Sequence, residues 1–181
     1  MQQGVATVDL RSLDLPSGAG TRLHLRVPPI AMRLGGQDYA ADPAQPELDL
    51  DVSRSLSGLH LRLRGHVEVT GPCWRCMADA RIPVDVDSSE FQADGREPDA
   101  PFDEDFDSQY LTGDELDLET WSRDAVAEAL PALILCREDC AGLCPTCGID
   151  RNTGACDCAE APADSRWDAL RELAERLGQD E

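Results

Sequence analysis

Alternating apolar and polar residues dominate the first ninety positions of the chain. The clearest run is 59–69, whose apolar positions share one face: Leu59, Leu61, Leu63, Val67 and Val69. A two-residue period is typical of a β-strand with one buried face. Residues 78–86 alternate in the same way, and shorter alternations cover 7–13 and 21–27. The pattern predicts antiparallel strands, with the two longest runs forming a hairpin whose tip is residues 73–76.

Two later segments have helical spacing. The first has Asp117 as a possible cap and Pro131 as a stop, and its apolar face carries Leu118, Trp121, Ala125, Ala129 and Leu130. The second begins at Asp164 or Ser165, ends at Gly178 and carries Trp167, Leu170, Ala174 and Leu177. We therefore expect an α+β fold: an antiparallel β-sheet or partly closed barrel, two packed helices and a C-terminal cysteine-rich metal-binding region.

Charge is distributed very unevenly. The formal net charge is −20, and all 16 basic residues are arginine. Residues 85–119 hold fourteen acids and one arginine. Together with the alternation and the helical spacing, the charge distribution predicts three regions. They are a β-rich region at 1–90, an acidic linker at 91–116, and a region at 117–181 that contains a helix, the cysteine-rich zinc region and the C-terminal helix. We expect the three to form one integrated domain. The acidic linker is either a solvated connector or a segment that docks on a basic partner.

Composition also excludes several classes of partner. So acidic a chain is not expected to bind DNA, because phosphate contacts need clustered positive charge. No apolar run reaches the roughly 18–20 residues needed to span a bilayer, and the first residues lack a basic and then apolar leader pattern. We therefore expect a soluble cytoplasmic protein with no membrane partner.

Eight cysteines give the strongest chemical signal: Cys73, Cys76, Cys136, Cys140, Cys144, Cys147, Cys156 and Cys158. Disulfides rarely persist in a reducing compartment, so a disulfide scaffold is disfavoured. The C-x-x-C at 73–76 joins two strand-like runs, unlike a redox motif that opens a helix. Eight thiolates divide naturally into two closed, tetrahedral, structural sites. Zinc is the expected metal, with two ions per chain, although four sulfurs also suit iron.

The spacing leaves two groupings open. In the preferred one, the four cysteines within 144–158 form a local site, and Cys73 and Cys76 join Cys136 and Cys140 across about sixty residues. This grouping splits no closely spaced pair. The alternative joins the two C-x-x-C knuckles, as in a zinc ribbon.

No catalytic constellation is visible. The chain has three histidines, all on predicted strands, and no lysine, so a standard phosphate-binding loop is excluded. The carboxylates form a charge run rather than a pair in contrasting environments. We expect a protein that is not an enzyme.

Several motifs together resemble the YceD family, which is named for large ribosomal RNA subunit accumulation. The motifs are Cys73-Trp74-Arg75-Cys76, Asp114-Glu115-Leu116-Asp117-Leu118, Ala129-Leu130-Pro131, the run from Cys136 to Gly148, and Arg166-Trp167-Asp168-Ala169-Leu170. The similarity extends over about residues 50–178. Cys156 and Cys158 depart from it, because members often carry other residues there.

The resemblance implies a non-enzymatic factor that supports accumulation of the 23S ribosomal RNA precursor and large-subunit assembly, with cysteines that ligate metal. The expected partners are the ribosomal RNA precursor, large-subunit ribosomal proteins, or both. The expected contact residues are Arg62, Arg64, Arg75, His60 and His66. Two alternatives are a zinc-holding or redox-responsive regulator, which loses metal on oxidation, and a metal-dependent hydrolase, which needs an open coordination position.

Overall fold

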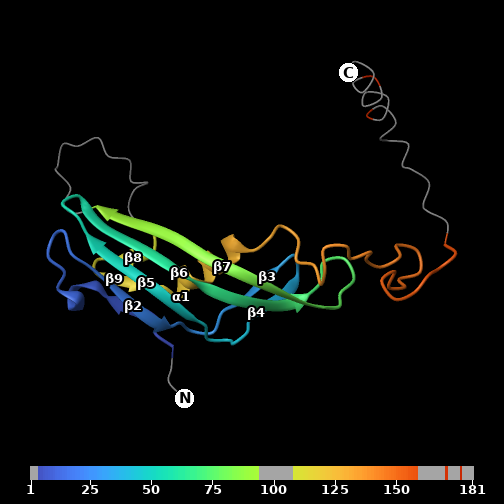
Figure 1. The fold of residues 1–181 in the computed structure, drawn as a ribbon, viewed down its shortest axis with the longest axis horizontal. Helices are drawn as coiled ribbons and strands as arrows, with labels where there is room; N and C mark the ends of the chain where they lie inside the picture. Colours follow the sequence, from blue (N-terminus) through green and yellow to red (C-terminus); the bar gives the residue numbers. More distant parts are fainter. Residues whose placement is uncertain (1–3, 94–107, 159–169, 171–175, 177–181) are drawn as a thin grey trace. The chain divides into compact units, whose positions relative to one another are not determined.

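The structure, a computed structural model, describes residues 4–93 and 108–158, together with Leu170 and Arg176 (Figure 1). The chain forms two compact units, Met1–Cys140 and Ala141–Glu181. The elements of the first unit are, in order, β1 (Thr7–Asp9), the 3-10 helix η1 (Leu10–Leu13), β2 (Gly20–Arg26), β3 (Ala31–Leu34), β4 (Gln37–Ala41), β5 (Glu47–Arg54), β6 (Gly58–Pro72), β7 (Asp79–Ala93), β8 (Leu111–Thr112), β9 (Glu115–Asp117) and α1 (Leu118–Ala129).

Strand β6 organises the larger of two antiparallel sheets. Along one edge it pairs with β7 without interruption, from Gly58 opposite Ala93 to Pro72 opposite Asp79. Along the other edge, its first half pairs with β5, and β2 pairs with β5 in turn. Near its far end the same edge pairs with β4, which pairs with β3. The predicted hairpin is confirmed.

The large sheet is open. In the described part of the chain β2, β3 and β7 each pair with one strand of this sheet, and no pairing joins these outer strands. The expectation of a partly closed barrel is therefore wrong. The sheet stays open because β5 and β4 pair with different parts of the same edge of β6. They therefore do not add successive strands that could curve round to meet β7.

A small sheet in the order β1-β9-β8 leads into α1. Asp117 ends β9 and caps the helix, because its Oδ1 accepts a hydrogen bond from the backbone N–H of Thr120 at 2.9 Å. The helix ends at Ala129, before Pro131, as the sequence predicts. The predicted strand over 7–13 is shorter than expected, because Asp9 Oδ1 accepts the N–H of Arg11 and starts η1.

Among the described elements α1 is the one α-helix, so the expected pair of packed helices is not seen there. The second predicted helix falls on 164–178, which lies outside the described residues except for Leu170 and Arg176. Residues 94–107 of the predicted acidic linker also lie outside them, whereas Leu111–Asp117 provides β8 and β9.

The apolar core belongs to the first unit. It lies between the inner face of the large sheet and α1, where Trp121 is fully buried and its Nε1 donates to Ser88 Oγ at 3.0 Å. The apolar residues of 59–69 are buried, and the polar residues between them face outward, as alternation predicts. Among the described residues after 140, Cys144 is the one buried apolar side chain. No helix in the described part of the chain has the length and apolar character to cross a bilayer.

Candidate metal centres and the charged sheet face

The tip of the β6–β7 hairpin forms the first cysteine cluster. The N–H of Cys73 donates to the carbonyl of Ala78 at 2.7 Å, and the N–H of Met77 donates back to Cys73 at 2.9 Å. Met77 adopts a left-handed φ of 62°, which closes this tight turn. The N–H of Trp74 donates to the carbonyl of Ile134 at 2.8 Å. This bond brings the segment after α1 to the knuckle, where the remaining two cysteines follow.

Four sulfur atoms meet there. Cys73, Cys76, Cys136 and Cys140 have sulfurs that all lie within 4.8 Å of one another. The Cys73–Cys140 pair is separated by 3.7 Å and the Cys76–Cys136 pair by 3.6 Å. Zinc–sulfur bonds of about 2.3 Å in a tetrahedron place sulfurs about 3.8 Å apart, whereas a disulfide needs about 2.05 Å. The cluster therefore has the dimensions of a closed tetrahedral metal site.

The surroundings of the first cluster shift the pKa values of its thiols in opposite directions. Burial raises the pKa of the Cys73 thiol, but the backbone N–H groups of Cys136, Cys76 and Arg75 outweigh that effect and bring the pKa to about 6. Partial desolvation of the Cys136 thiol, followed by the neighbouring thiol of Cys76, raises the pKa of Cys136 to about 12. The Cys73 thiolate thus forms readily, whereas the Cys136 thiolate becomes favourable when a divalent cation is bound. Arg75 also stabilises the site, because its Nη1 donates to the carbonyl of Cys140 at 2.9 Å.

The second cluster lies in the second unit. Cys144, Cys147, Cys156 and Cys158 have sulfurs within 4.8 Å of one another. The N–H of Gly148 donates to the carbonyl of Cys144 at 2.9 Å, and the φ of Gly148 is 76°, a value that glycine tolerates. The knuckle predicted from the sequence is present.

Backbone groups polarise this second cluster too. The N–H groups of Cys147 and Thr146 lower the pKa of Cys144 to about 5. The hydrogen bond to Cys147, followed by burial, raises the pKa of Cys158 to about 12. Arg151 Nη2 lies 4.0 Å from Cys144 Sγ and adds positive charge. The four sulfurs are therefore arranged to share a cation.

The structure resolves the grouping of the cysteines. It has the four-and-four division preferred from the spacing, and the grouping that joins the two knuckles is wrong. All eight thiols are free of disulfides. The identity of the metal stays a prediction, because four sulfurs fit both zinc and iron.

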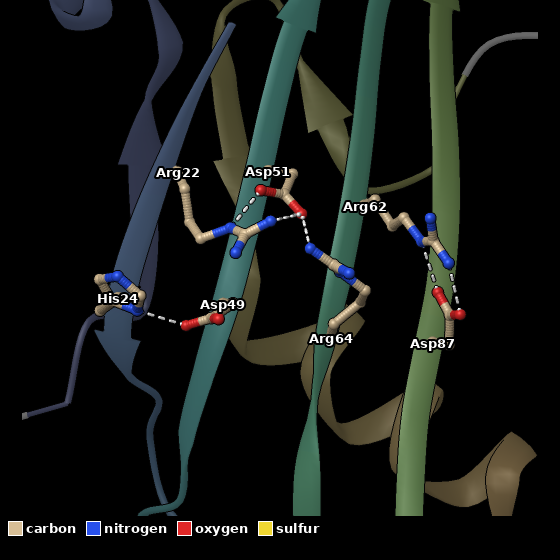
Figure 2. A network of polar contacts seen from close by, with 7 residues as sticks. All are labelled: Arg22, His24, Asp49, Asp51, Arg62, Arg64 and Asp87. Carbon is tan, nitrogen blue, oxygen red and sulfur yellow. Dashed lines mark hydrogen bonds and ion pairs between the residues drawn. The ribbon is translucent and has the colours of Figure 1, made fainter.

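Two of the three arginines predicted to contact a partner, Arg62 and Arg64, lie on the outer face of the large sheet, among carboxylates (Figure 2). Arg62 makes a two-pronged pair with Asp87, with both N–O distances 2.6 Å. Asp51 on β5 bridges Arg22 and Arg64. These hydrogen bonds lower the pKa of Asp87 and of Asp51, and they raise the pKa of Arg62. The arginine face is thus interleaved with negative charge.

The two histidines share that face. His66 Nδ1 lies 2.8 Å from Asp85 Oδ1, and the ring of His60 lies 4.6 Å from that of Phe91. Arg75 instead lies at the first cysteine cluster. The contact role of all five residues stays a prediction. Sequence reasoning missed the acids of β5, although residues 47–54 alternate clearly.

Comparison with known proteins gives a family and relatives. A family model described as large ribosomal RNA subunit accumulation protein YceD matches residues 61–174. Uncharacterised proteins of Mycobacterium bovis and of two strains of Mycobacterium tuberculosis are 35% identical over 147 residues, which is 79% of this chain and 69% of each relative. No solved structure matches significantly.

Proposed function

This chain belongs to the YceD family, and we propose that it is a non-enzymatic, zinc-stabilised factor that supports 23S ribosomal RNA accumulation and biogenesis of the large ribosomal subunit. The observation that carries the proposal is the pair of four-sulfur clusters, both of which lie inside the region that matches the family. The family description suggests the process, accumulation of large-subunit ribosomal RNA, and the clusters suggest that bound metal stabilises the protein.

The chemistry of the clusters supports a structural role for the metal. Four sulfur ligands complete a tetrahedral shell, so a metal held by them keeps no open position for water or substrate. Three of the four cysteines in the first cluster are buried. Zinc has no redox chemistry of its own and accepts this geometry without strain. Such sites hold backbone segments together and present their surfaces to a partner.

The proposed partners are the ribosomal RNA precursor, large-subunit ribosomal proteins, or both, met in the cytoplasm. On the RNA side, Arg62 and Arg64 would exchange their carboxylate partners for phosphates, flanked by His60 and His66, with Arg75 at the knuckle. The carboxylates support selectivity, because a ligand must compete with Asp87 and Asp51 for the guanidinium groups.

A depletion strain with plasmid-borne variants tests the main proposal. Wild-type protein should carry two zinc ions by native mass spectrometry with metal analysis, and it should restore the 23S ribosomal RNA level. Cys76→Ser should lose the first ion and fail to restore the RNA. Ala78→Ser is the matched control, because Ala78 is exposed and two residues from Cys76. Full restoration by a Cys76→Ser protein that lacks the ion would contradict the proposal.

The arginine face has its own test. Arg62→Glu with Arg64→Glu should weaken co-sedimentation with large-subunit precursor particles. Arg33→Glu is the control, because Arg33 is also an exposed arginine on a strand, but its carboxylate neighbour is Asp38 on β4. Unchanged association of the double variant would remove these residues from the interface.

A zinc-holding or redox-responsive regulator is a second candidate function. The observation that favours it is the exposure of Cys136 in one cluster and Cys147 in the other. Peroxide should then release zinc rapidly at micromolar concentrations, as followed with a chromogenic chelator. Retention of both ions under those conditions would contradict the redox-responsive function and would be consistent with a purely structural role for the metal.

A further inference from the structure

Strand β7 has an open edge. It is fifteen residues long, and its one sheet partner in the described part of the chain is β6. An open edge presents unpaired backbone N–H and C=O groups and can accept a further strand. The edge is therefore a candidate surface for an extended peptide.

The register shows which backbone groups face outward. Glu68 lies opposite Pro83, and the carbonyl of Glu68 accepts the N–H of Asp42, on the side away from β7. Pro83 has no N–H, and proline in a strand points its nitrogen away from the ladder. Because the β6–β7 register is unbroken, Asp85, Asp87, Ser89 and Phe91 have the same orientation as Pro83. Their N–H and C=O groups point to the open edge.

Helix α1 turns this edge into a groove. A hollow of about 410 Å³ lies between them, and its lining includes Asp85, Asp87, Ser89 and Glu90 of β7 and Glu128 of α1. The indole of Trp121 fixes the helix against β7 through its hydrogen bond to Ser88. A groove between a strand edge and a helix fits a peptide that adds as a strand.

The charge of the groove defines its ligand. Its four ionisable lining residues are all acidic, and the Asp85 side chain is 93% exposed. The last turn of α1 has no basic residue, so the negative end of the helix dipole adds to this field. A peptide with arginine or lysine at alternate positions would pair with the backbone, and its cations would meet Glu90 and Glu128 and compete with Arg62 for Asp87 and with His66 for Asp85.

Other occupants fit less well. RNA would bring phosphates against the carboxylates. A second copy of β7 paired antiparallel around Val86 would place Asp85 opposite Asp87 of the other chain, and like charges directly opposite are unfavourable. The acidic run at 102–107 of this chain carries the same sign of charge as the groove.

We infer that the groove between the open edge of β7 and helix α1 binds an extended basic segment of a protein partner by strand addition. The peptide pairs with the backbone of Asp85 to Phe91, and its cationic side chains lie over Asp85 and Asp87, where they compete with His66 and Arg62 for the carboxylates.

The direct test uses a seven-residue peptide of alternating arginine and valine and the zinc-loaded full chain, with fluorescence anisotropy as the readout. In an antiparallel ladder, a residue whose N–H meets β7 has its side chain on the same face as Asp85 and Asp87. Methylating the arginine backbone nitrogens should therefore weaken binding about tenfold or more, because several hydrogen bonds of about fivefold each are lost. Methylating the valine nitrogens should change little. Equal effects of the two methylated peptides would overturn strand addition.

Two pairs of protein variants complete the test. Ser89→Pro removes an outward N–H and should abolish binding, whereas Ser89→Ala keeps it and should bind normally. Glu128→Lys should weaken binding several-fold without touching β7, and Glu119→Lys is its control at the other end of α1. Tighter binding of a single-stranded RNA at the same site, or a dimer in sedimentation that Ser89→Pro abolishes, would assign the edge to another occupant and overturn the inference.

Discussion

Replacing Cys156 by serine removes one of the four sulfurs that surround the second cluster. The described residues after 140 contain one buried apolar side chain, Cys144, so within 141–158 no apolar core of the segment's own can replace the metal. Structural zinc contributes about 10–16 kcal/mol of apparent binding free energy in small metal domains, which exceeds the ~5–15 kcal/mol net stability of an ordinary domain. Loss of this ion should therefore unfold 141–158.

The first unit should respond differently, because its sheet and α1 enclose an apolar core of their own. Hydrogen exchange measured by mass spectrometry separates the two responses. In Cys156→Ser, amides such as those of Cys144 and Gly148 should lose about a thousandfold or more of their protection, a change that needs only about 4 kcal/mol. Amides of β6 and β7 should stay as in the wild type.

Asp157→Ser is the matched control, because Asp157 is exposed and lies between two of the cysteines. It should keep two zinc ions and full protection, whereas Cys156→Ser should keep one. If 141–158 stays protected in a Cys156→Ser protein shown to carry one ion instead of two, metal at the second cluster is not what folds this segment, and the reasoning is refuted.

Three further predictions concern the first unit. Leu63→Ala, at a side chain with 0% exposure, should lower the free energy of unfolding by about 2–5 kcal/mol in urea titration, because it opens a cavity in the core. Asp117→Ala should lower it by about 1 kcal/mol and Asp117→Asn by less, because asparagine can still accept the N–H of Thr120. Arg22 and then Arg64 lower the pKa of Asp51 when the protein is folded, so this group stabilises the fold above its unfolded pKa of about 3.9 and loses that effect as the pH falls through the lower folded value. Wild type should therefore be more stable than Asp51→Asn at pH 7, and the difference should vanish in acid-range urea titrations; a constant difference would contradict the assignment.

Local signals explain what the sequence predicted correctly. The β6–β7 hairpin follows from alternation that buries one face, and the start of α1 follows from the side chain of Asp117. The cysteine grouping follows from chain distance, because closely spaced pairs stay together. Each of these features is decided by residues that are near one another in the chain or that share one chemical character.

Features with a short local pattern, or with partners far along the chain, were missed. The β3–β4 hairpin turns at Gly35 and Gly36, whose φ values are 56° and 83°, but the strands around it are only four and five residues long. The basic face of β6 looked free, because its own residues do not reveal that Asp51 and Asp87 come to lie beside it. The strand pairing that places Asp51 and Asp87 beside Arg62 and Arg64 depends on how separate strands align, and the residues of β6 alone do not determine that alignment.

The shared use of β6 restricts how the chain can change in evolution. Between Arg64, the last residue paired with β5, and Val69, the first paired with β4, the strand keeps an unbroken register with β7. A one-residue deletion there would turn Val67 and Val69 outward and displace Cys73 from its cluster. Insertions and deletions in related chains should therefore fall in the turns, such as 55–57 and 35–36, and spare the interval from Gly58 to Cys76.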